Sequence, residues 1–131
     1  MNNKGDIIMD PKFVEVMKYE GPATIVTVNG HPASVVNTWM SYIKVNQAGN
    51  YLLIPAAGMR SIEHDFEKDN HVTLTMGTKE VEGTVGPGAG YHVHGTGEFF
   101  ESGAEFDEMK ETFPWIRKVL KVKIDDIEQK I

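Results

Sequence analysis

The chain is organised around the stretch Val35-Val36-Asn37-Thr38-Trp39-Met40-Ser41-Tyr42-Ile43-Lys44, which is rich in β-forming residues. A second stretch follows closely, Leu52-Leu53-Ile54-Pro55-Ala56-Ala57-Gly58-Met59-Arg60-Ser61. Together they predict a strand, a turn and a second strand that leads into a helix. Small residues at a helix start expose backbone N–H groups, and these groups suit a phosphate. A phosphorylated cofactor is the first ligand that this pattern suggests.

The composition is that of an ordinary globular protein. The 131 residues are 40% hydrophobic and 24% charged, which predicts one domain spanning residues 1–131 with a single core. There is no cysteine, so disulfides, zinc–cysteine sites and thiol nucleophiles are excluded. The formal net charge of -6 disfavours nonspecific binding to nucleic acid. An anionic ligand would therefore need local positive groups.

No targeting or membrane segment is recognisable. Met1–Asp6 lacks the basic and apolar pattern of a secretory signal, and no apolar run reaches membrane-spanning length. The expectation is a cytoplasmic protein without a membrane partner, with which the lack of cysteine agrees.

The remaining elements follow from local signals. Asp10-Pro11 predicts the start of a short helix that ends at Gly21-Pro22. Asn29-Gly30 predicts a tight hairpin turn after a strand at 23–28, and Ser61 is the expected N-cap of a helix over 62–66. The other expected elements are strands at 35–42, 51–54, 72–76, 91–100 and 119–124 and a helix at 106–113. This order favours a small six-stranded antiparallel barrel with two or three short flanking helices.

A barrel of this size is filled by its own side chains, so a nucleotide-sized cofactor would lie outside it or between subunits. The glycine-rich segment Gly86-Pro87-Gly88-Ala89-Gly90 lacks the Gly-Lys-Ser/Thr of a phosphate-binding P-loop and is expected to form a wide loop. Arg60 and Ser61 offer the best phosphate-binding chemistry, against the alternative of a surface arginine beside a capping serine.

Two further features have alternative interpretations. His92 and His94 share one face of a strand and, with Glu98, resemble half of a cupin metal site. No histidine follows His94, so the commoner interpretation is a pair of half-exposed strand residues. Trp39 and Trp115 could stack on a ligand, although packing is commoner. Thr38 and Trp39 point to opposite faces, so both side chains cannot serve one ligand.

A family resemblance rests on several motifs taken together. They are Val36-Asn37-Thr38-Trp39 with Ser41-Tyr42, then Pro55, Gly58-Met59 and Glu63, then Gly86-Pro87-Gly88 and Trp115. This set resembles the pyridoxamine 5'-phosphate oxidase-like FMN-binding split-barrel family, in particular its small bacterial FMN-binding members, from about Phe13 to Ile131.

The resemblance implies a homodimer of six-stranded split barrels with one FMN per subunit at the interface. By matching position, Asn37, Thr38 and Trp39 would line the flavin, Pro55, Ala56 and Ala57 would pass along its ring or ribityl chain, and Arg60 and Ser61 would hold the phosphate. Trp115 and Ile131 of the partner subunit would cover the ring. The implied function is that of an electron carrier or a small flavin-dependent oxidoreductase, with a redox partner or small-molecule substrate that the residues do not define.

The chain also departs from the family's larger oxidases. It lacks their basic strand motif, and Ser61 stands where the small FMN-binding members have a lysine at the helix start. Phosphate affinity is therefore expected to rest on Arg60 and backbone amides. The basic residues that hold pyridoxamine phosphate are absent as well, which argues against vitamin B6 oxidation.

Overall fold

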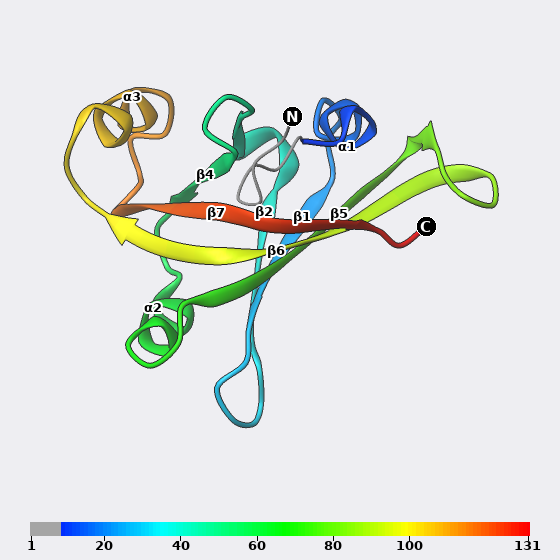
Figure 1. Ribbon diagram of the computed structural model, residues 1–131. Helices are drawn as coiled ribbons and strands as arrows, with labels where there is room; N and C mark the ends of the chain where they lie inside the picture. Colours follow the sequence, from blue (N-terminus) through cyan, green and yellow to red (C-terminus); the bar gives the residue numbers. More distant parts are fainter. Residues whose placement is uncertain (1–8) are drawn as a thin grey trace, which may run out of the picture.

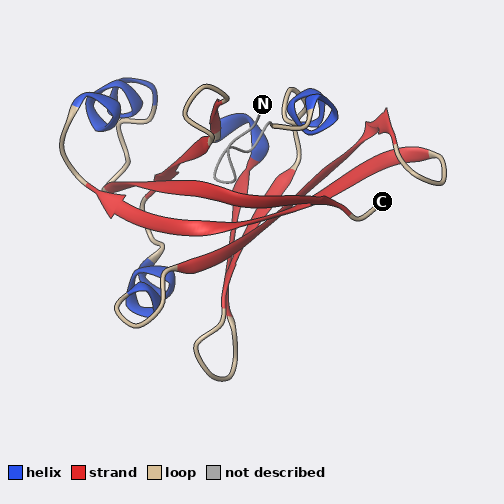
Figure 2. Ribbon diagram, in the orientation of Figure 1, coloured by secondary structure: helices blue, strands red, loops and turns tan. Residues whose placement is uncertain are grey.

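The computed structural model describes residues 9–131, so the expectation for Met1–Asp6 lies outside the described residues. Within this range seven strands, three α-helices and one 3-10 turn follow one another (Figure 1). In chain order they are α1 (Pro11–Val16), β1 (Pro22–Thr27), β2 (Ser34–Trp39), η1 (Met40–Tyr42), β3 (Lys44–Asn46), β4 (Tyr51–Ala56), α2 (Arg60–Phe66), β5 (His71–Glu82), β6 (Pro87–Phe100), α3 (Ala104–Thr112) and β7 (Lys118–Gln129). The helices lie around the edges of the strands (Figure 2).

The strands form one antiparallel sheet with the order β2-β1-β5-β6-β7-β4-β3. Its two edge strands, β2 and β3, are consecutive in the chain and are joined through η1. Because the sheet curls, the short connection can bridge its two edges without pairing them, which makes the fold a split barrel. The expected mainly β split barrel is confirmed, with seven strands in place of six.

The extra strand arises where a single strand through Tyr42 was expected. β2 ends at Trp39, the chain makes the 3-10 turn η1, and pairing resumes as β3 at Lys44. The amide N–H of Met40 donates to the carbonyl of Gly21 at 2.8 Å, and the Met40 side chain is fully buried. The β-rich composition predicted an extended chain, but burying Met40 at the corner requires a turn there.

Buried apolar side chains fill the inside of the curled sheet. The strands contribute Ile25, Leu74, Val93, Leu120 and Val122, each at most 1% exposed. Helix α1 covers one opening with Phe13 and Val16, which are fully buried. As expected, Asp10 caps this helix, because its carboxylate accepts the Lys12 amide at 2.9 Å, and a proline follows it at the first helical position.

The glycine-rich segment is not the expected wide loop. β5 and β6 pair as far as Glu82 and Pro87, and the Gly83 amide donates to the Gly86 carbonyl at 2.7 Å in the turn between them. Further along β6, a Cβ on Gly95 would lie 2.1 Å from the Lys123 carbonyl oxygen. Glycine is usually disfavoured inside strands, but here it allows β7 to approach closely.

Two smaller expectations were also wrong. The hairpin at Asn29-Gly30 exists, but its loop covers residues 28–33, because Thr27 and Ser34 are the last paired residues. Ser61 is not an N-cap, because α2 already begins at Arg60 and Met59 holds the cap position.

Candidate functional site

The start of α2 presents polar groups to open space. Arg60 and Ser61 are exposed, and Met59 offers no side-chain acceptor to the first amides of the helix. A Cβ placed on Gly58 would meet no atom within 4 Å, so the space beside Gly58 is open among the described residues. A guanidinium, a hydroxyl and uncapped backbone N–H groups are a donor set that fits a phosphate. The structure therefore brings Arg60 and Ser61 together as a candidate anion site.

Arg117, which comes just before β7, fixes this turn, and it was not among the residues predicted for the site. Its backbone amide donates to the carbonyl of Ala56, and its Nε donates to the carbonyl of Ala57, both at 2.8 Å. Its guanidinium also pairs with Glu63 on α2. One side chain thus joins the end of β4, the turn and the helix. Arg117-Lys118 just before the last expected strand was the available sequence signal.

Glu63 lies between two cations. Besides Arg117, the Lys118 Nζ lies 2.9 Å from a Glu63 carboxylate oxygen. Partial burial acts to raise the pKa of Glu63, but the hydrogen bonds and charges of Arg117 and Lys118 outweigh it, so the pKa lies below its usual value. The carboxylate stays ionised at neutral pH and neutralises part of the local positive charge, which leaves Arg60 as the exposed cation at the helix start.

The side chains of the three candidate residues of β2 do not all point to the same face of the sheet. Asn37 and Trp39 are exposed, with Trp39 at 49%, whereas Thr38 is buried. The Thr24 hydroxyl on β1 donates to the Asn37 side-chain oxygen at 2.7 Å, which orients the amide. Asn37 and Trp39 can therefore meet a ligand with their side chains, whereas the Thr38 side chain is buried and its backbone pairs with Ala23 of β1.

The three residues at the end of β4 also differ. Pro55 and Ala56 are buried in the ladder with β7, opposite Val119 and Lys118. Ala57 is exposed. Of the three, Ala57 alone offers its side chain to a ligand over the turn.

Trp115 belongs to an aromatic cluster of its own chain. Its ring centroid lies 5.9 Å from that of Tyr42 and 5.5 Å from that of Phe113. Trp115 nevertheless remains 50% exposed. Since Tyr42 follows Trp39 by three residues in η1, the cluster lies at the end of the chain's own β2. An exposed aromatic surface of this kind is unusual unless something covers it.

Ile131 lies far from Trp115. Trp115 precedes β7 and Ile131 follows it, and a twelve-residue strand spans on the order of 40 Å. Ile131 exchanges backbone hydrogen bonds with Gly90 at 3.3 Å and is 58% exposed beside a cavity of about 460 Å³. Within one subunit the structure does not bring these two candidate residues together.

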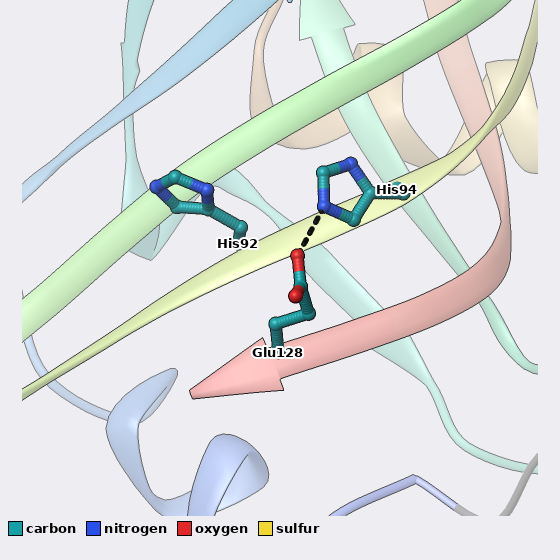
Figure 3. Close-up of side chains that lie close together, drawn as sticks. All are labelled: His92, His94 and Glu128. Carbon is teal, nitrogen blue, oxygen red and sulfur yellow. Dashed lines mark hydrogen bonds and ion pairs between the residues drawn. The ribbon is translucent and has the colours of Figure 1, made fainter. Parts of the chain in front are cut away.

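The carboxylate beside the two histidines is not the one that the cupin-like pattern predicted. His92 and His94 are half-buried neighbours on β6, with ring centroids 6.2 Å apart. Glu98 lies further along the strand opposite Lys121, and the carboxylate beside the two histidines is that of Glu128 on β7 (Figure 3). The expectation of Glu98 as third ligand was wrong.

No helix formed by residues 9–131 is long and apolar enough to cross a membrane.

Comparisons with known proteins agree with this architecture. The chain is 37% identical over 117 residues to the FMN-binding protein of Nitratidesulfovibrio vulgaris strain Miyazaki F, covering 89% of this chain and 94% of that protein. An FMN-binding protein from Syntrophomonas wolfei superposes with a TM-score of 0.61 at 14% identity, over 83% of this chain and 76% of the other. A FAD-binding protein from Mesorhizobium loti gives 0.63 at 13%, over 88% and 87%. The sequence pattern of the pyridoxamine 5'-phosphate oxidase family matches residues 9–130, and this chain belongs to that family.

Proposed function

We propose that this protein binds one FMN per subunit at the interface of a homodimer and serves as an electron carrier or a small flavin-dependent oxidoreductase. The observation that carries the proposal is the start of α2, where Arg60 and Ser61 stand beside a turn that Arg117 holds in place. The 37% identical relative is itself an FMN-binding protein.

In this proposal the phosphate of FMN lies at the Arg60–Ser61 turn. The net charge of -6 repels an anion at long range, so the site depends on short-range donors. Arg60 provides a fork of N–H groups, Ser61 a hydroxyl, and the first turn of α2 its free amides. Arg117 is engaged with Glu63 and Ala57, and its role is to position the turn.

The flavin ring would lie against the exposed faces of β2 and the aromatic cluster. Asn37 and Trp39 share the outer face of β2, and Trp115 is half exposed beside Tyr42. Bound FMN supplies the capacity to accept and donate electrons. The residues of this chain would hold the ring, exclude water from its faces and supply a hydrogen bond from the Asn37 side chain.

We propose the dimer because the two residues expected to cover the ring lie at opposite ends of β7. Ile131 and Trp115 are too far apart in one subunit to cover the same ring. We infer that a ring held beside Trp115 of one subunit is covered by the partner subunit's Ile131. The resemblance gives both Trp115 and Ile131 to the partner subunit. We propose instead that Trp115 comes from the subunit that holds the phosphate, since it packs against Tyr42 of its own chain at the end of β2.

The basic residues needed to hold pyridoxamine phosphate as a substrate are lacking, so we do not propose vitamin B6 oxidation. A cytoplasmic location is proposed because it suits a redox protein without cysteine.

The visible absorption spectrum tests the proposal. The protein is examined as purified, then after FMN is added and the excess removed. An oxidised-flavin spectrum retained at about one FMN per subunit supports it, and a colourless protein that takes up no FMN overturns it. Sedimentation of the FMN complex tests the interface, because a monomer that still holds FMN would contradict the proposed dimer site.

A further inference from the structure

A second cluster of reactive side chains lies on the outer face of the sheet. His92 and His94 of β6 and Glu128 of β7 converge there (Figure 3). One ligand atom from each lies within 4.8 Å of the other two. The three side chains are partly exposed, so an ion could reach them from solvent. None of them takes part in the proposed FMN site.

The register of two strands creates this cluster. His92 and His94 are two residues apart and therefore point to the same face. Glu128 lies directly opposite His92 in the β6–β7 ladder. Between His94 and Gly95 the register shifts, so β7 carries one extra residue, Asp125, next to the cluster. Such bulges bend a strand and re-aim its side chains.

The ring of His94 is oriented from both sides. Its Nδ1 lies 3.0 Å from the Thr73 hydroxyl on β5, and its Nε2 lies 2.7 Å from a Glu128 carboxylate oxygen. When Nδ1 carries the proton and donates it to Thr73, Nε2 keeps its lone pair for a cation. Histidine ligands of metals are commonly held in this way by a second group. Thr73 is therefore a positioning residue for His94.

The spacing of the ligand atoms suits a small ion. Bonds of about 2.0–2.1 Å in tetrahedral geometry place ligand atoms about 3.3 Å apart. The contact of His94 with Glu128 at 2.7 Å is shorter than that value, and the 4.8 Å limit of the cluster is longer. Small rotations of partly exposed side chains can close this difference. A bound ion would replace the 2.7 Å contact between the His94 Nε2 and the Glu128 carboxylate.

We propose that His92, His94 and Glu128 form a binding site for a divalent transition-metal ion of the zinc class. Two imidazoles and a carboxylate are typical ligands of such ions, and water completes the shell. Asp126 lies opposite His94 in the ladder and adds negative charge to the same face. Lys130, 3.9 Å from Glu128, offsets part of that charge. The bound ion joins β6 to the last residues of β7, three positions before Ile131.

Calorimetric titration with Zn²⁺ tests the site in the full-length protein after dialysis against a chelator. The expected result is one Zn²⁺ per chain with micromolar affinity. His92→Ala, His94→Ala and Glu128→Gln each remove a ligand atom and are each expected to weaken binding by more than about a hundredfold, the upper range for loss of a supporting residue. Thr73→Val is expected to weaken it less, by about tenfold, through loss of the His94 partner.

Two matched variants serve as controls. His71→Ala removes an exposed histidine that pairs with Asp69, and Asp126→Asn removes charge without removing a ligand. Both are expected to keep the affinity within about threefold. Binding that persists in His92→Ala or Glu128→Gln, or that falls equally in His71→Ala, overturns the proposal. So does the absence of Zn²⁺ binding by the folded wild-type protein. FMN content is measured in parallel, so that the two proposals are tested separately. A protein that fails to bind FMN but binds Zn²⁺ as expected would still support the metal site.

Discussion

The side chain of Arg117 donates a hydrogen bond of 2.8 Å from its Nε to the carbonyl oxygen of Ala57, sixty residues earlier in the chain. The same guanidinium pairs with Glu63 on α2. The turn between β4 and α2 is thus held by a charged side chain that comes just before β7. A site that depends on exposed backbone amides needs such a support, because the turn itself is built from small residues.

Replacing Arg117 with Ala is expected to weaken FMN binding about tenfold and to lower the free energy of unfolding by about 1–3 kcal/mol, because the turn loses its support and Glu63 loses a partner. Fluorescence titration with FMN and denaturant unfolding measure the two effects. Arg117→Lys keeps the positive charge but removes the planar guanidinium with its several N–H donors. If it binds FMN as the wild type does, positioning by the guanidinium is excluded.

Replacing Arg60 with Ala is expected to weaken FMN binding by about ten- to a hundredfold, because a charge-assisted contact to phosphate is lost. Unlike Arg117→Ala, it is expected to leave stability nearly unchanged, since Arg60 is exposed. Lys68→Ala, which removes one positive charge just after the same helix, is the control for net charge. An equal loss of affinity in both variants would mean that Arg60 acts only through the overall field.

Replacing Trp115 with Leu is expected to raise the fluorescence of bound FMN, because an indole beside a flavin quenches its emission. Steady-state and lifetime fluorescence of the FMN complex measure this. Phe113→Leu disturbs the same cluster without removing an indole and is the control. Unchanged emission in the Trp115 variant would assign that ring to packing alone.

Local signals predicted those parts of the fold that depend on neighbouring residues. Asp10-Pro11 predicted α1, and alternation predicted most of the strands. Gly88 and Gly90 at the start of β6 were expected to lie in a loop, because glycine usually marks loops. The reason for Gly90 is tertiary: a Cβ there would lie 2.9 Å from the Ile131 side chain. That contact has no signature in the local sequence.

The residues of the candidate site were likewise predictable from the sequence only where they depend on local signals. Arg60 and Ser61 followed from the chemistry of a helix start, but Arg117 did not, because 54 residues separate it from Glu63. The expectation of Glu98 beside the histidines has the same cause. Spacing along one strand favoured Glu98, whereas the register between β6 and β7 decides the neighbour and includes a bulge. Long-range register is what a single sequence does not specify.

The stability contributed by Glu63 is expected to depend on pH. Its pKa in the folded protein lies below the usual 4.5, despite partial burial, because Arg117 and Lys118 stabilise the carboxylate. Its contribution is therefore fully present above pH 4.5 and is lost as the pH falls through the folded pKa. Glu63→Gln is expected to be less stable than the wild type by about 1–3 kcal/mol at pH 7. This difference in the free energy of unfolding is measured with denaturant and is expected to shrink below pH 4.5. A difference that does not depend on pH would contradict the ion pairs of Glu63.

The contact between Thr27 and Asp65 offers a test of how α2 is attached to the sheet. The buried Thr27 hydroxyl donates to the Asp65 carboxylate at 2.5 Å, and this bond is the main reason that the pKa of Asp65 is lowered. Thr27→Val keeps the side-chain shape but removes the donor, so the melting temperature is expected to fall on the order of 5 °C at pH 7. Thr75→Val on the adjacent β5 is the control. The loss is expected to diminish below pH 3.8, where the carboxyl takes up a proton in the unfolded chain.

Because α2 carries Arg60 and Ser61, the Thr27 variant is also expected to bind FMN more weakly. Weaker FMN binding without a change in melting temperature would show that Thr27 acts on the site and does not anchor the helix.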